Sequence, residues 1–104
     1  MSHRLIVRLD AESDIAEAAL WYEEQVAGLG LELVSEVGLA VGRAVDAPLH
    51  FPLLRRRPEV RRVLTRRFPY RVFFIVRPDA IIVFGVIHAT RHDRHWQGRL
   101  AGES

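Results

Sequence analysis

The chain contains no cysteine and no lysine, and each absence excludes a class of chemistry. Without cysteine the protein has no disulfide, no thiolate nucleophile and no cysteine-ligated zinc. Without lysine, all 15 basic residues are arginines. The guanidinium group is always charged and is a poor proton carrier, but it binds phosphate or carboxylate through two parallel hydrogen bonds. The basic side chains are therefore suited to binding anions rather than to moving protons.

Long hydrophobic runs are also missing. No segment approaches the roughly 20 apolar residues of a membrane span, and Leu5–Leu9 is too short for a signal peptide and contains Arg8. A cytoplasmic protein with no membrane partner is expected. The 104 residues, 49% hydrophobic and 27% charged, predict one globular domain over residues 1–104. No glycine-rich phosphate loop, Ser-His-Asp order or nucleotide fingerprint is present, so no cofactor is expected.

Charge is divided unevenly along the chain. Residues 1–50 contain three arginines and nine carboxylates, a net charge of −6, whereas residues 51–104 contain twelve arginines and four carboxylates, a net charge of +8. A GC-rich genome would explain the use of arginine in place of lysine but not this clustering. The asymmetry indicates that the second half binds an anionic partner.

Apolar periodicity predicts the elements of the first half. Residues 3–9 alternate as a short strand, and residues 10–27 and 31–45 have helical spacing. Asp10 is the predicted N-cap of the first helix. The Gly28-Leu29-Gly30 segment between the helices predicts a short connection, and helices joined in this way form an antiparallel hairpin.

Small residues predict how this hairpin packs. Gly38 and Gly42 are expected to let a neighbouring backbone approach, for which Ala18 and Ala19 provide a small surface. The apolar stripe of the second helix is predicted to consist of Leu31, Val34, Val41 and Val45.

The second half has strand character. A proline-punctuated loop is predicted over residues 46–58, followed by strands at 60–67, 70–77 and 80–88. The last two strands are almost continuously apolar, which is typical of central strands. The order β-α-α-β-β-β predicts an α+β fold of two layers, a helical hairpin packed on an antiparallel sheet.

Aromatic residues have different expected roles. Trp21 and Tyr22 are predicted to pack between the helices and the sheet, and Phe73 and Phe74 to lie in the core rather than to stack on bases. Trp96 lies in a basic C-terminal tail, where it either seals the edge of the core or contacts a partner.

Three histidines, His88, His92 and His95, would share one face of a helix. Such a set could bind a metal, but His88 ends a predicted strand, and no HExxH pattern exists. No metal is therefore expected, and His88 is expected to be a buried, hydrogen-bonded residue at the end of its strand.

Four segments in a fixed order resemble a known family. They are Trp21-Tyr22-Glu23, Gly28-Leu29-Gly30, the Arg66–Val72 hairpin entry, and Val86-Ile87-His88 followed by Arg91 and Trp96. Over residues 4–99 the chain resembles the RelE/ParE toxins of bacterial type II toxin–antitoxin systems. The resemblance implies a growth inhibitor encoded beside a cognate antitoxin that silences it.

The resemblance leaves two targets open. RelE-like toxins cut mRNA on the ribosome, whereas ParE-like toxins inhibit DNA gyrase. By motif, Arg71 and Arg91 match two RelE arginines, but the RelE lysine pair and C-terminal tyrosine have no counterpart. The resemblance therefore favours ParE-like action. If the protein were RelE-like, Arg71, Arg91 and His92 would be the catalytic candidates, His92 as the proton carrier.

Binding of an antitoxin or anionic target is predicted to involve residues on strands, which hold side chains in fixed directions, and residues in the tail. The run Arg55-Arg56-Arg57 has two possible roles: it could bind phosphate, or it could be the solvated tip of a loop. The candidate binding residues are Arg62, Arg66, Arg71, Arg91 and Trp96.

Overall fold

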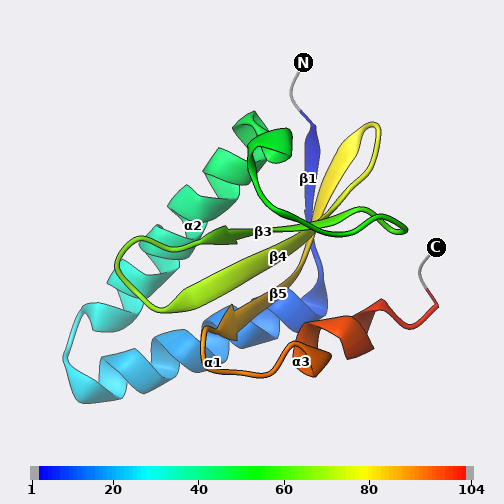
Figure 1. Ribbon diagram of the computed structural model, residues 1–104. Coiled ribbons are helices and arrows are strands. Elements are labelled where there is room, and N and C mark those ends of the chain that lie inside the picture. The colour runs from blue at the N-terminus through cyan, green and yellow to red at the C-terminus, as the bar shows by residue number, and fades with distance from the viewer. Residues whose placement is uncertain (1–2, 103–104) are drawn as a thin grey trace.

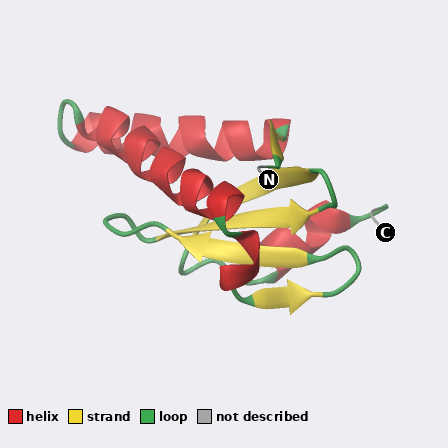
Figure 2. Ribbon diagram, turned by 90° about the horizontal axis from the view of Figure 1, so that it is seen from above, coloured by secondary structure: helices red, strands yellow, loops and turns green. Residues whose placement is uncertain are grey.

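The computed structural model describes residues 3–102 as two helices packed on one face of a sheet, with a short C-terminal helix on the other (Figures 1 and 2). The elements, in chain order, are β1 (Arg4–Val7), α1 (Leu9–Gln25), α2 (Leu29–Asp46), the 3₁₀ turn η1 (Pro48–His50), β2 (Leu53–Arg55), β3 (Val60–Leu64), β4 (Tyr70–Val76), β5 (Ala80–His88), α3 (Arg94–Gln97) and the 3₁₀ turn η2 (Gly98–Leu100). The predicted α+β class and the helical hairpin on the sheet are confirmed.

The sheet has five strands in the order β1-β5-β4-β3-β2. The pairs β5–β4, β4–β3 and β3–β2 are antiparallel, but β1 runs parallel to β5, so the sheet is mixed rather than wholly antiparallel. The segment 46–58, predicted as a loop, contains η1 and β2. A three-residue strand leaves too few residues for an alternating pattern to be seen in the sequence.

The two continuously apolar strands, β4 and β5, are central and covered on both faces, as predicted. Val72 and Phe74 of β4 face the helical hairpin in one core cluster, while Phe73 and Ile75 face α3 in a second cluster. Both rings are buried, on opposite sides of the sheet, because successive residues of a strand point to opposite faces. The prediction that these two phenylalanines belong to the core is confirmed.

The inner face of α2 consists of other residues than the sequence indicated. The buried residues of α2 are Gly30, Leu33, Val37, Ala40 and Ala44. The predicted stripe was wrong at Leu31 and Val34, which are exposed, while Val41 and Val45 are partly buried. Helices that approach closely bury small side chains, so the largest apolar residues do not mark the inner face here.

Glycine has two distinct roles at this turn. Gly28 precedes α2 with a φ of 90°, a backbone conformation that favours glycine. Gly30 lies inside α2, where a Cβ would be 2.6 Å from the Ala19 carbonyl oxygen. The close approach predicted for Gly38 and Gly42 was wrong, because nothing lies within 4 Å of a Cβ at either position. Ala19 does face a glycine backbone, but that of Gly30.

Two further predictions on α1 need correction. The N-cap residue is Arg8, without a side-chain capping hydrogen bond, and Asp10 lies in the first turn, where its charge still favours the helix dipole. Tyr22 packs on Phe68 with ring centroids 4.9 Å apart, as predicted, but Trp21 is 56% exposed.

No helix within residues 3–102 is long and apolar enough to cross a bilayer.

Candidate functional site

A cavity on the α3 side of the sheet brings together three of the residues predicted to bind a partner. The register pairs Arg62 of β3 with Phe73 and Leu64 with Arg71 of β4, so Arg62 and Arg71 project from the same face of the sheet. The cavity, which we call the arginine cavity, has a volume of about 220 Å³ and is lined by Leu54, Arg62, Arg71, Asp93 and Trp96.

Arg71 is held in place by several contacts. Its Nη1 donates a hydrogen bond to Asp93 Oδ1 at 2.9 Å, and its Nη2 donates to the Arg91 carbonyl oxygen at 2.7 Å. The guanidinium carbon lies 5.1 Å from the centroid of the Phe73 ring, and the side chain is only 14% exposed. Arg71, on β4, therefore binds the segment that comes after β5. Its positive charge is paired with the Asp93 carboxylate.

Trp96 belongs to the core cluster on this face. Its ring stacks on Phe73 with centroids 5.4 Å apart and an interplanar angle of 19°, and the residue is 5% exposed. The polar tail predicted after Arg91 is thus a short helix and a 3₁₀ turn that bury Trp96 and Leu100. Of the two roles considered for Trp96, the structure favours sealing of the core.

Among the residues that the structure describes, Asp93 is the one carboxylate that lines the arginine cavity. The pKa of Asp93 is lowered, chiefly because Arg71 donates a hydrogen bond to it, with the indole N–H of Trp96 as a second cause. That N–H is directed to the carboxylate without reaching hydrogen-bonding geometry. Asp93 is therefore ionised at neutral pH and is not suited to act as an acid.

The side chains of the three catalytic candidates, Arg71, Arg91 and His92, do not line a common cavity. Arg91 is exposed and lines a different cavity, of about 280 Å³, together with Tyr70, His88 and His95. His92 is exposed, and its Nδ1 accepts a hydrogen bond from the Arg94 backbone N–H at 3.1 Å. Of Arg71, Arg91 and His92, Arg71 alone lines the arginine cavity.

The three histidines lie on different parts of the chain rather than on one helix. His88 ends β5, His92 lies in the following turn, and His95 is in α3. His88 is only partly buried, and its Nδ1 is 2.8 Å from Thr90 Oγ1. Within residues 3–102 no group of three or more potential metal ligands is found.

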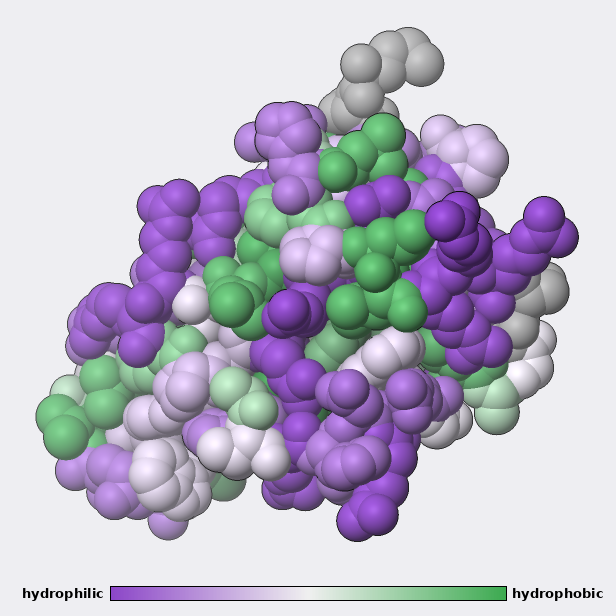
Figure 3. Space-filling model, viewed as in Figure 1, coloured by the Kyte–Doolittle hydropathy of each residue, from purple (hydrophilic) through white to green (hydrophobic). Residues whose placement is uncertain are grey.

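Arg62 and Arg66 share a second cavity, but Arg66, predicted to lie on a strand over residues 60–67, lies beyond the end of β3 at Leu64. This cavity has a volume of about 370 Å³, and Arg43, Phe51 and Leu64 also line it. Arg62 thus lines both cavities, whereas Arg66 lies outside the arginine cavity. Figure 3 shows this face of the molecule, where apolar patches lie between strongly hydrophilic side chains. The run Arg55-Arg56-Arg57 is exposed throughout.

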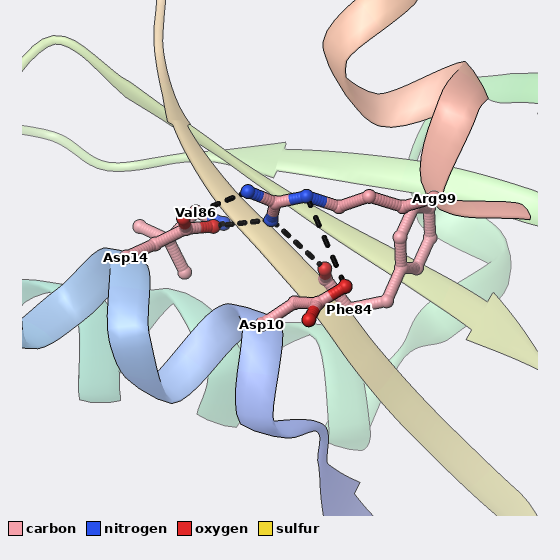
Figure 4. A network of polar contacts seen from close by, with 5 residues as sticks. All are labelled: Asp10, Asp14, Phe84, Val86 and Arg99. Atoms are coloured by element: carbon pink, nitrogen blue, oxygen red, sulfur yellow. Dashed lines mark hydrogen bonds and ion pairs between the residues drawn. The ribbon is translucent and has the colours of Figure 1, made fainter.

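A partly buried ion pair that the sequence did not indicate joins α1 to the segment after α3 (Figure 4). Arg99 Nη1 and Nη2 donate to the two oxygens of Asp14 at 2.5 and 2.9 Å, and Nη1 also donates to the Phe84 carbonyl at 3.2 Å. Asp14 Oδ2 accepts the backbone N–H of Val86 at 2.8 Å. The bonding raises the pKa of Arg99, mainly through the hydrogen bond to Asp14.

The position of this pair follows from the sheet. The β1–β5 pairing ends at Val7 and Val83, so residues 84–88 of β5 have no strand neighbour on that side. Asp14 and Arg99 bond to backbone groups of this open stretch and take the place of a strand. Their separation of 85 residues leaves no local signal in the sequence.

The similarity of this chain to known proteins lies in its fold and not in its sequence. No protein-family model matches the chain, and no curated protein matches it in sequence. Among solved structures, it is similar to a chain of the chromosomal ParDE TA system from P. aeruginosa, with a TM-score of 0.73 and 17% identity, over 84% of this chain and 96% of that chain. The resemblance seen in the sequence is thereby confirmed as one of architecture. The protein has the fold of the RelE/ParE toxins.

Proposed function

We propose that this protein is the toxin of a type II toxin–antitoxin pair and is silenced by a cognate antitoxin encoded alongside. The RelE/ParE fold supports this function, as does the similarity to a chain of a ParDE system. The net charge of +8 in residues 51–104 supports a partner segment rich in carboxylates.

We further propose that the toxin acts by binding DNA gyrase rather than by cutting mRNA. One observation carries this choice: Arg71 is paired with Asp93, and among residues 3–102 no histidine, tyrosine or glutamate lines the arginine cavity. Cutting RNA requires a base for the 2′-OH and an acid for the leaving oxygen. Arginine and tryptophan can fill neither role, and an aspartate held ionised by an arginine has no proton to give to the leaving oxygen.

Ribosome-dependent mRNA cleavage remains the second candidate. The observation in its favour is that Arg62 and Arg71 line the same cavity, since two fixed cations could stabilise charge on a phosphate in the transition state. A third candidate, from a different class, is a non-toxic module that only binds its antitoxin.

Induction of the protein in bacterial cells separates the three candidates. We expect growth to stop, purified gyrase to lose supercoiling activity on addition of the protein, and ribosome-bound mRNA to stay intact. Cuts in ribosome-bound mRNA that disappear with Arg71→Ala, but not with the matched control Arg4→Ala on β1, would establish the endoribonuclease instead. Unaffected growth together with tight antitoxin binding would identify the non-toxic module.

A further inference from the structure

A further cavity lies where the start of β1, the end of α2 and the turn between β4 and β5 come together (Figure 1). We call it the β1 cavity; it is lined by residues 3, 46–50, 59 and 76–78. Its volume of about 570 Å³ exceeds that of the three cavities described above and is within the range of pockets that bind small molecules. It shares no lining residue from the described part of the chain with those cavities.

Half of the lining of the β1 cavity is apolar. The apolar residues are Ala47, Pro48, Leu49, Val76 and Pro78. Leu49 is 67% exposed, although it lies beside these apolar groups. Covering an exposed leucine with an apolar ligand removes its surface from water and is favourable. The walls therefore suit a ligand with an apolar body.

The charged groups of the β1 cavity leave one carboxylate without a counter-ion. Glu59 is paired with Arg61 Nε at 2.7 Å, and Arg77 has an interaction of its own. The Asp46 side chain, in contrast, has no hydrogen bond or ion pair with any residue from 3 to 102. Asp46 is also the last residue of the 18-residue helix α2, where the helix dipole adds partial negative charge. The cavity therefore attracts a cation.

A buried nitrogen atom of the lining also lacks a partner. Nδ1 of His3 is shielded from solvent and has no hydrogen bond within the described residues. Such groups cost free energy and are uncommon in folded proteins. In the neutral imidazole whose proton is on Nε2, Nδ1 accepts a hydrogen bond. His3 thus offers an acceptor to an N–H group of a ligand.

We infer that the β1 cavity binds a small organic cation, consisting of an apolar body and a protonated amine. The ammonium group has three donors and can bond to Asp46 and to His3 Nδ1, while the apolar body covers Leu49. An anion would meet the Asp46 carboxylate and the negative end of α2. A neutral apolar molecule would leave both polar groups without a partner.

This inference goes beyond the proposed function and is independent of it. Arg62, Arg66, Arg71, Arg91 and Trp96, the candidates for binding an antitoxin or an anionic target, do not line the β1 cavity. A failure of ligand binding at the β1 cavity would leave the proposed toxin activity untouched, and the reverse also holds.

Three probes of similar size separate the effect of charge from that of shape. Phenethylamine is cationic, phenethyl alcohol is neutral and phenylacetate is anionic. At about pH 7.5 an amine is charged and an ordinary imidazole is mostly neutral. In NMR titrations at equal ionic strength, phenethylamine should shift the Leu49 and Val76 amide signals saturably, with a Kd on the order of millimolar for so small a ligand. The indole N–H of Trp96, which does not line the cavity, is the internal control.

The other two probes should respond differently. Phenethyl alcohol should bind about tenfold more weakly than phenethylamine, because it lacks the charge-assisted hydrogen bond. Phenylacetate should cause no saturable shift. If either of them binds as tightly as phenethylamine, or if none of the three gives a saturable shift, the β1 cavity is not a site for organic cations.

Variants test the two polar groups separately. Asp46→Asn retains the shape of the side chain and should weaken phenethylamine binding by about tenfold while leaving phenethyl alcohol unchanged. Glu24→Gln makes the same change in charge on α1 and should affect neither probe. His3→Phe keeps a ring but removes the acceptor, so it tests the site if Asp46→Asn is poorly folded. Binding of phenethylamine to the folded variants with the affinity of wild type would overturn the inference.

Discussion

The two tryptophans show how residues of one type take opposite roles. Trp96 follows a basic segment yet is buried against Phe73, whereas Trp21 lies within a helix yet is 56% exposed. Arg71 shows the same effect for charge. It matched an arginine expected to face a phosphate, but it binds Asp93 and a backbone carbonyl instead. A residue's neighbours in space, rather than its neighbours in sequence, decide which of its possible interactions forms.

Trp96→Ala should therefore be strongly destabilising. Emptying a buried aromatic site typically costs about 3–5 kcal/mol, and Trp96 stacks on Phe73 in the core cluster beside α3. Trp21→Ala is the matched control, and an exposed substitution should change the free energy of unfolding by no more than about 0.5 kcal/mol. Urea denaturation measures both. Equal and small losses would show that Trp96 does not seal the core.

At the scale of elements, the connection between α1 and α2 is held by several specific contacts. Gly30 brings the backbone of α2 against the Ala19 carbonyl. The Glu23 carboxylate accepts the N–H of Gly28 at 2.8 Å and that of Gly30 at 3.0 Å, and so satisfies donors at the start of α2. The hairpin is held by this turn as well as by its apolar face.

Gly30→Ala should destabilise the protein by about 1–3 kcal/mol, because its Cβ would press on a carbonyl in a packed interface. Gly38→Ala in the same helix provides the control. Nothing lies within 4 Å of a Cβ at Gly38, so removing an exposed helical glycine should stabilise the protein by about 0.5–1 kcal/mol. Thermal unfolding should separate the two variants in opposite directions. A shift of the same sign in both would contradict the close approach.

Glu23 should make the hairpin sensitive to acid. Its pKa lies below the usual 4.5 because it accepts hydrogen bonds from Gly28 first and Gly30 second. A lowered folded-state pKa means that the stabilisation is complete above the unfolded-state pKa and is lost as pH falls through the folded-state pKa.

The stability gap between wild type and Glu23→Gln should accordingly be largest near neutral pH and should narrow below about pH 4.5. Glu24→Gln is the control, because the Glu24 side chain has no polar contact with residues 3–102. Denaturation midpoints across a pH series provide the measurement. A gap that is constant with pH would show that the Glu23 charge does not cap α2.

At the scale of the whole molecule, several arginines form ion pairs within the chain. Arg61, Arg67, Arg71 and Arg99 each pair with a carboxylate of the same chain. Arg62 and Arg66 do not, within the described residues, and both line one cavity beside β3. The part of the positive charge that remains available to a partner is therefore smaller than the net charge of the second half.

The double charge reversal Arg62→Glu/Arg66→Glu should weaken binding of the proposed antitoxin and make that binding less dependent on salt, because fewer ion pairs form across the interface. Calorimetry over a range of salt concentrations measures both effects. Arg55→Glu/Arg56→Glu has the same change in charge on the exposed turn after β2 and is the control. If both double variants behave alike, net charge rather than the β3 edge determines the affinity.

The sequence by itself determined the parts of this protein that depend on local pattern. Helical and strand periodicity identified both helices and the three long strands, and the two continuously apolar strands, β4 and β5, are central as predicted. The order of the elements and a few short motifs were enough to indicate the RelE/ParE fold. Periodicity is a property of consecutive residues, so it can be read before the chain is folded.

Tertiary structure alone decided the rest. Four features join residues that lie far apart in sequence. They are the parallel pairing of β1 with β5, the burial of Trp96, the pairing of Arg71 with Asp93 and the Asp14–Arg99 contact. Even the inner face of α2 was misassigned at Leu31 and Val34, because it is set by where α1 and the sheet lie against the helix. Each of these features depends on which surfaces meet after the chain folds, and a pattern of consecutive residues does not contain that information.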